Sequence, residues 1–199
     1  IYVDTGAMYR AMAYYFLTHQ ISAEDEDALR KACDDIQIEL SYRDGVQKVI
    51  LNGEDISGEI RKEEVGNMAS ATSGYSFVRE KLLSLQQDLA ARNNVIMDGR
   101  DIGTCVLPDA QLKVYLTAGV YTRAMRRYKE LTEKGVACDL DEIAKDIEER
   151  DYRDMHREIA PLKAAEDVEI LDSSDMDISQ VVDAIYGMAV RAGLSSELM

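Results

Sequence analysis

The chain has 199 residues and a formal net charge of −15, from 38 acidic and 23 basic residues, and 46% of its residues are hydrophobic. This length and balance predict a globular protein of one domain with small inserts. The acidic charge argues against nucleic acid as a partner. No apolar run reaches the roughly 18 residues of a membrane span, so we expect no membrane partner either. The three cysteines are far apart and form no CxxC pair, which argues against a disulfide framework and a zinc site and favours a cytoplasmic location.

The first half of the chain is predicted to be helical, with one β-insert. The segments IQIEL and VQKVIL alternate apolar and polar residues, and Asp44-Gly45 between them is a strong hairpin turn signal. Asn52-Gly53 supplies a second turn, so we expect a patch of two or three antiparallel strands. In chain order, the predicted elements are a strand at 1–3, a buried helix at 9–19, a polar helix at 24–35, strands at 36–40 and 46–51, and helical residues at 60–91.

The second half alternates short apolar strands with helices, which predicts a parallel sheet with crossover helices. The predicted elements are strands at 95–97, 112–116 and 168–171, helices at 121–134 and 178–190, and a charged helical region at 139–166. Ligands of such sheets bind beyond the carboxyl ends of the strands. Here those ends carry Asp4-Thr5-Gly6, Asp98-Gly99-Arg100-Asp101 and Asp172-Ser173-Ser174.

The segment VIMDGRDIGT carries the most chemistry. An acid at the end of a buried strand, Asp98, can orient a magnesium ion through water. Gly99 allows the backbone to approach a ligand closely, Arg100 could hold a phosphate, and Asp101 could accept hydrogen bonds from the amino group of a base. The alternative for Asp-Gly by itself is a strand that ends in a polar turn.

Two further segments offer arginines to a phosphate. In DTGAMYR, Thr5 is placed as a helix N-cap, and Arg10 adjoins a helix N-terminus that favours anions. Arg79 is either an exposed helix arginine or a second phosphate ligand. Arg150, Arg153 and Arg157 are spaced to share one helix face. That face is either a solvated, salt-bridged surface or part of a mobile lid that closes over phosphates, with a loop around Gly135.

Five blocks of the chain together resemble the bacterial cytidylate kinase family almost from end to end. The blocks are DTGAMYRA, LNGEDISGEIRKEEV, VREKLLSLQQ, VIMDGRDIGTCVLPDAQLKVYLTA and ERDYRDMHREIAPLKAAEDVEILDSS. The resemblance implies an α/β P-loop kinase fold: a three-layer parallel sheet with helices on both faces, a small antiparallel β insert and an arginine-rich helical lid. The implied division is a core at 1–32, 69–119 and 158–199, a monophosphate-binding insert at 33–68, and a lid region at 120–157.

The implied activity is phosphoryl transfer from ATP to CMP or dCMP in pyrimidine nucleotide metabolism, by a monomer that uses Mg²⁺ with ATP. Nine positions match the family's monophosphate-side residues: Thr5, Tyr9, Arg10, Ser70, Arg79, Arg100, Asp101, Asp154 and Arg157. By resemblance, Arg10 and Arg79 hold the acceptor phosphate, and Ser70, Asp101, Asp154 and Arg157 read the cytosine and the sugar. Arg150, Arg153 and Arg157 neutralise the transferring group, because phosphoryl transfer needs positioning and charge.

One feature of the family is absent from this sequence: there is no GxxxxGK[ST] phosphate loop. The resemblance implies that a strand-loop-helix unit of about 25–30 residues is missing and that the sequence is incomplete. In the family that strand lies between the strands ending at Asp98 and near Thr117, so the chain as given is expected to form two sheet fragments with unpaired inner edges. Two alternatives stay open: a CMP-binding module without turnover, and a kinase for UMP or AMP.

Overall fold

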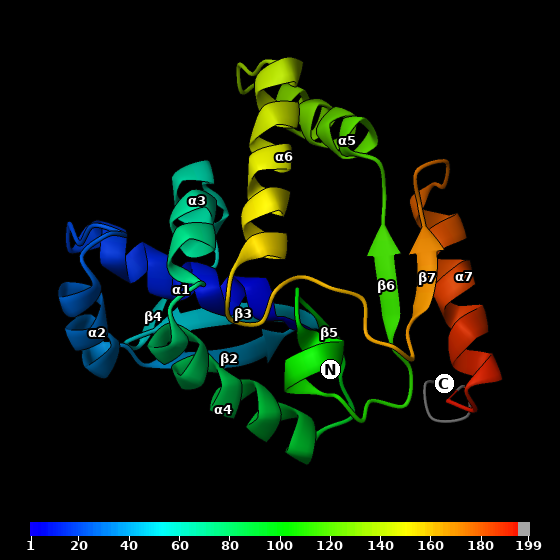
Figure 1. The fold of residues 1–199 in the computed structure, drawn as a ribbon, viewed down its shortest axis with the longest axis horizontal. Helices are drawn as coiled ribbons and strands as arrows, with labels where there is room; N and C mark the ends of the chain where they lie inside the picture. The colour runs from blue at the N-terminus through cyan, green and yellow to red at the C-terminus, as the bar shows by residue number, and fades with distance from the viewer. Residues whose placement is uncertain (195–199) are drawn as a thin grey trace.

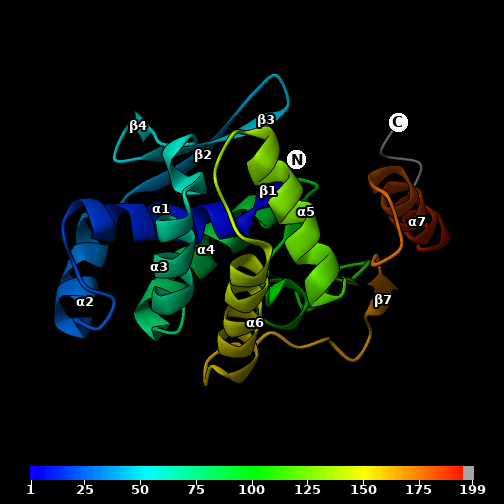
Figure 2. The ribbon, with the colours of Figure 1, turned by 90° about the horizontal axis from the view of Figure 1, so that it is seen from above.

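The structure is a computed structural model that describes residues 1–194. Figure 1 shows its helices and strands, and Figure 2 shows them from above. The elements of the first half are β1 (Tyr2–Asp4), α1 (Thr5–Thr18), α2 (Glu26–Asp35), β2 (Ile38–Arg43), β3 (Val46–Leu51), β4 (Glu54–Asp55), a 3-10 turn at Glu59–Arg61, α3 (Glu63–Thr72) and α4 (Ser76–Arg92). Those of the second half are β5 (Ile96–Asp98), a π-helical turn at Ile102–Val106, β6 (Val114–Thr117), α5 (Val120–Glu133), α6 (Leu140–His156), β7 (Glu169–Asp172) and α7 (Ile178–Arg191).

The predicted α/β class, with parallel strands and a small antiparallel insert, is confirmed. β1 pairs with β5, and β6 pairs with β7, both in parallel. Within residues 1–194 no strand joins β5 to β6, and the two pairs stand apart in Figure 1. This is the split into two sheet fragments that the family resemblance implied. It leaves β5 and β6 each with one unpaired edge.

The insert forms the antiparallel sheet β2-β3-β4, so the larger of the two predicted strand numbers is correct. Its first turn follows the sequence signal: Asp44 and Gly45 have φ of 52° and 75°, as a tight hairpin turn requires. The register pairs Arg43 with Val46 across that turn. The first strand begins at 38 rather than at the predicted 36, because Ile36 is buried as the cap of α2.

The hydrophobic core is centred on α1, which lies between α3 and the β2–β4 sheet (Figure 1). Apolar residues on several of its faces predicted a buried helix, and Met8, Met12 and Phe16 are completely buried. Side chains from α2, α3, α4 and β3 complete this cluster. The β6–β7 pair is less covered, since Leu116 and Ile170 are exposed. The core therefore lies around α1, which directly follows β1 in the chain.

Two predicted helix boundaries are wrong. The N-cap of α1 is Asp4, not Thr5: the Asp4 carboxylate accepts the Ala7 N–H at 2.9 Å, whereas the Thr5 hydroxyl donates to the Asp98 carbonyl at 2.7 Å. The charged helix α6 ends at residue 156 instead of continuing to 166. Pro161 disfavours helical backbone before it, and the preceding residue has φ of 47°.

The segment predicted to be a lid, 120–157, contains α5 and α6, two packed helices that reverse direction near Gly135, where φ is 71°. The α6 helix also lies beside α3, the helix that follows the antiparallel sheet in the chain, as both views show (Figures 1 and 2). No helix among residues 1–194 is long and apolar enough to cross a bilayer. Asp154 of α6 binds Arg100 in the loop after β5, whereas Arg126 of α5 donates to the Ser173 and Met176 carbonyls beyond β7.

Candidate functional site

The site begins where β1 and β5 end side by side, with Asp4 paired in register with Asp98. Thr5 is almost fully buried, and its hydroxyl ties the start of α1 to the last residue of β5. Gly99 follows in a space that admits no side chain, because a Cβ there would lie 2.5 Å from Thr5 Oγ1 and 2.8 Å from Ile102 Cδ1. The close approach predicted at this glycine is thus made by the protein's own side chains.

Arg10 is held at this corner by Asp4. Arg10 Nη2 lies 2.9 Å from Asp4 Oδ2, while the other oxygen of the same carboxylate caps α1. Asp4 was not among the predicted site residues, although its place at a strand end was a signal for it. The pair leaves Arg10 Nε buried and without a hydrogen-bond partner.

Arg79 and Asp101 form a buried ion pair. Their side chains are only 10% and 8% exposed, and Arg79 Nη2 donates to Asp101 Oδ2. Arg79 also donates to the Ser73 carbonyl at 3.1 Å, and its guanidinium lies 5.4 Å from the centre of the Tyr9 ring. Burial raises the pKa of Tyr9, and the charge of Arg79 opposes that rise. The option that Arg79 is an exposed helix arginine is therefore wrong.

The lid contributes Asp154, which is 4% exposed at the end of α6. Arg100 Nε donates to Asp154 Oδ2 at 3.0 Å, which joins the loop after β5 to the lid. Arg157, just beyond α6, has Nη1 3.6 Å from Asp154 Oδ1 and 3.2 Å from the Ser73 hydroxyl. These contacts join the end of α6 to the loop after β5 and to Ser73. Ser73 is a second residue missing from the predicted site, and the sequence gave no signal for it.

Arg150 and Arg157 are gathered into the cluster, and Arg153 is not. Burial is the main cause that lowers the pKa of Arg150, and the charge of Arg100 lowers it further. Burial is also the main cause that lowers the pKa of Arg157, followed by the charge of Arg79. Both arginines stay charged at neutral pH, as arginine does in proteins. Arg153 is exposed on the outside of α6 and makes no ion pair within residues 1–194. Of the three arginines predicted to share one helix face, only Arg150 and Arg157 therefore lie in the cluster.

Four buried side-chain atoms in the described part of the chain have no hydrogen-bond partner. Buried polar atoms are almost always paired, so each unpaired one calls for an explanation. These four are the Nε atoms of Arg10 and Arg150, Ser70 Oγ and Arg157 Nη2. All belong to residues that the sequence had marked as site residues. Three are donors on guanidinium groups, which form charge-assisted, bidentate contacts with phosphate.

Asp98 is exposed at the mouth of the same site and accepts a hydrogen bond from the Tyr2 hydroxyl at 3.1 Å. Its pKa is raised because nearby atoms displace part of its water and because the Asp4 carboxylate is close. No cluster of three or more metal-binding side chains occurs among residues 1–194. The single carboxylate of Asp98 suits Mg²⁺, because this ion is commonly held by one or two carboxylates together with the phosphates of a substrate.

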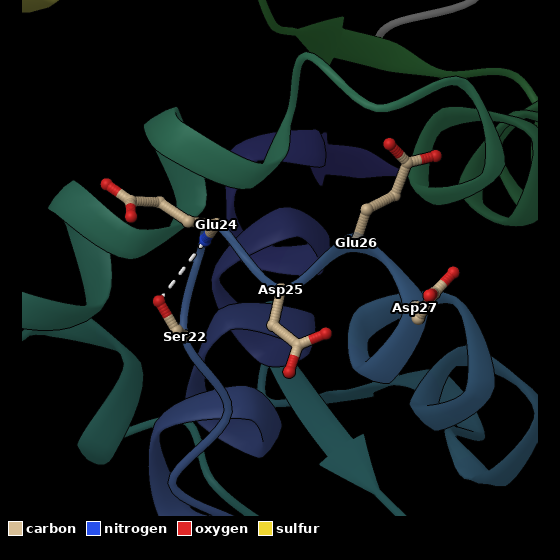
Figure 3. Close-up of a pocket in the computed structure, with 5 residues that line it drawn as sticks. All are labelled: Ser22, Glu24, Asp25, Glu26 and Asp27. Carbon is tan, nitrogen blue, oxygen red and sulfur yellow. Dashed lines mark hydrogen bonds between the residues drawn. The ribbon is translucent and has the colours of Figure 1, made fainter.

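A separate, open surface depression of about 700 Å³ lies at the start of α2. It is lined by Ser22 and by the carboxylates of Glu24, Asp25, Glu26 and Asp27, which point in different directions (Figure 3). Asp25 caps α2, and Ser22 accepts the backbone N–H of Glu24 at 3.3 Å. Carboxylates repel the phosphates of a nucleotide, so this depression is no candidate for a nucleotide site.

Comparisons with known proteins show the family of the chain. A family model described as cytidylate kinase matches residues 1–191. The cytidylate kinase of Lactobacillus johnsonii is 46% identical over 185 residues, which cover 93% of this chain and 80% of the relative. Those of Streptococcus pneumoniae and Streptococcus gordonii are 48% and 45% identical over 96% of this chain, covering 86% and 85% of the relatives. The chain belongs to the cytidylate kinase family.

Proposed function

We propose that this protein transfers the γ-phosphoryl group of ATP to CMP or dCMP, giving CDP or dCDP for pyrimidine nucleotide metabolism. The observation that carries the proposal is the set of buried, unpartnered polar atoms on Arg10, Ser70, Arg150 and Arg157. Guanidinium donors buried without partners suit a dianionic phosphate, and a buried hydroxyl beside them suits a sugar or a base. The family and the names of the relatives support the same reaction.

In this proposal Arg10 and Arg79 bind the phosphate of CMP. An oxygen of that phosphate attacks the γ-phosphorus of ATP, the bond to the bridging oxygen breaks, and ADP leaves with the electron pair of that bond. The attacking phosphate oxygen carries no proton that must be removed, so no general base is needed. Arg150 and Arg157 stabilise the charge on the transferring group, which is the main requirement of a loose transition state. Asp98 is the residue that would hold the Mg²⁺ that accompanies ATP, and the ion would supply further charge neutralisation.

The preference for cytosine follows from the two buried carboxylates. Asp101 and Asp154 are paired with arginines, yet a carboxylate has about four acceptor positions, so each can also accept from the 4-amino group of cytosine. Uracil offers a carbonyl oxygen at that position, which would face a carboxylate oxygen with no hydrogen-bond donor between them. Sites built on such hydrogen bonds discriminate strongly against analogues that cannot make them.

We also propose the division of labour among the segments. Residues 1–32, 69–119 and 158–199 act as the core, 33–68 as the monophosphate-binding insert, and 120–157 as the lid. The Arg100–Asp154 pair, 3.0 Å between Nε and Oδ2, links core and lid, so the lid can carry Arg150 toward the phosphates as it closes. Closure excludes water from the reacting groups, which strengthens each charge contact.

The test is turnover by the product of the complete natural reading frame, with ATP, Mg²⁺ and CMP. We expect CDP formation that falls at least about 100-fold in kcat/KM in Arg10→Ala, as loss of a charged phosphate contact requires. Arg92→Ala is the matched control: Arg92 is 77% exposed on α4 and should leave the rate unchanged. A protein that CMP stabilises against heat without turnover would be a binding module and would refute the proposal.

A further inference from the structure

The insert is fastened to the outer edge of β1 by two side chains. An edge strand exposes backbone groups that need partners. The carboxamide of Gln47, on β3, accepts the Asp4 N–H at 3.0 Å and donates to the Asp4 carbonyl at 3.4 Å. The hydroxyl of Tyr42, on β2, donates to the Tyr2 carbonyl at 3.0 Å. The hairpin thus takes the place of a neighbouring strand along β1.

Gln47 contacts the one residue of β1 that also organises the proposed phosphate site. The Asp4 carboxylate caps α1 with one oxygen and binds Arg10 at 2.9 Å with the other. The position of that carboxylate depends on the Asp4 backbone. On one side that backbone is held by the pairing with Asp98 and on the other by Gln47. Asp4 is only partly exposed, so water does not replace Gln47 freely.

We propose that Gln47 is a positioning residue for the acceptor phosphate: it fixes Asp4, and Asp4 aims Arg10. The inference rests on the proposed function, because Arg10 is taken there as a ligand of that phosphate. It assigns the insert a task beyond covering the nucleotide, since a residue of its central strand orients a group of the core. A carboxamide suits this task because it has one donor group and one acceptor group.

The experiment measures kcat and KM for CMP with the complete protein at saturating ATP. Gln47→Met keeps the volume of the side chain and removes both hydrogen bonds. We expect KM for CMP to rise about fivefold, the usual effect of one or two lost neutral hydrogen bonds, with kcat and KM for ATP within about twofold of wild type. Gln47→Ala serves as a second variant should the longer side chain disturb folding, which circular dichroism detects.

Tyr42→Phe is the matched control. It removes the other hydrogen bond from the same hairpin to the same strand, but it does not touch Asp4. Its KM for CMP should equal that of wild type. A double-mutant cycle with Arg10→Ala distinguishes this role from a general loosening of the insert, which would lower kcat/KM by the same factor with or without Arg10. If Gln47 acts through Arg10, Gln47→Met lowers kcat/KM no further once Arg10 is gone.

Three results would overturn the inference. These are an unchanged KM in Gln47→Met, an equal rise in KM in Tyr42→Phe, and additive losses in the cycle with Arg10→Ala. The second would make Gln47 a fastener of the insert only. Failure of the proposed function is a distinct result, because it shows as absence of CMP turnover in the wild-type protein itself.

Discussion

The buried pair of Arg79 and Asp101 gives the most quantitative prediction. Replacing Asp101 by alanine leaves the Arg79 guanidinium, whose side chain is 10% exposed, with the Ser73 carbonyl as its remaining hydrogen-bond partner among residues 1–194. Removing one member of a buried ion pair typically costs about 3–5 kcal/mol of unfolding free energy, because an uncompensated charge stays buried. For a chain of this length that loss lowers the melting temperature by roughly 6–12 °C at the lower limit of about 3 kcal/mol.

The assay is urea unfolding of Asp101→Ala, Arg79→Met and the double variant at pH 7. The double variant should be less destabilised than the sum of the single ones by at least about 1.5 kcal/mol, because neither charge is left buried alone. Additive losses, or a loss below about 1 kcal/mol in Asp101→Ala, would refute the reasoning, since both outcomes fit a solvated pair.

Two further predictions concern the loop after β5. Since the pKa of Asp98 is raised above 3.8 in the folded protein, its ionised form opposes folding: its favourable contribution is present below pH 3.8 and is lost as the pH rises through the folded-state pKa. Asp98→Asn should therefore be more stable than wild type at pH 7 in urea unfolding, without catalysing transfer, and a less stable variant would contradict this. Gly99→Ala should lose about 1–3 kcal/mol, because its Cβ would lie 2.5 Å from Thr5 Oγ1. Gly66→Ala, in α3 with open space around it, should gain up to about 1 kcal/mol as the control, and equal effects at the two glycines would count against the steric argument.

Local signals in the sequence were sufficient for several parts of the fold. The hairpin at Asp44-Gly45 was predictable because a tight turn needs positive φ at both central residues and these residue types accept it. The buried helix α1 was predictable from apolar residues on several faces. The gap between β5 and β6 followed from the family resemblance rather than from any local pattern.

Other features depend on contacts between distant residues and could not be predicted. The burial of Arg79 depends on Asp101, 22 positions later, and the cap of α1 depends on which of two adjacent oxygens reaches the helix. Helical spacing grouped Arg153 with its neighbours, but which part of a helix face is covered depends on what packs against it. The role proposed for Gln47 could not be predicted either. The alternation of apolar and polar residues is the same in a strand exposed to water and in a strand that packs against the edge of another strand.

The central claim is that the arginines and buried carboxylates form a site for a cytidine monophosphate that is phosphorylated. The most direct measurement is the ratio of kcat/KM for CMP, UMP and AMP with the complete protein, ATP and Mg²⁺. The account predicts a preference for CMP over UMP of at least about 100-fold, from the amino group that Asp101 and Asp154 can bind and that uracil lacks. Comparable rates with CMP and UMP, or no turnover of CMP, would contradict it.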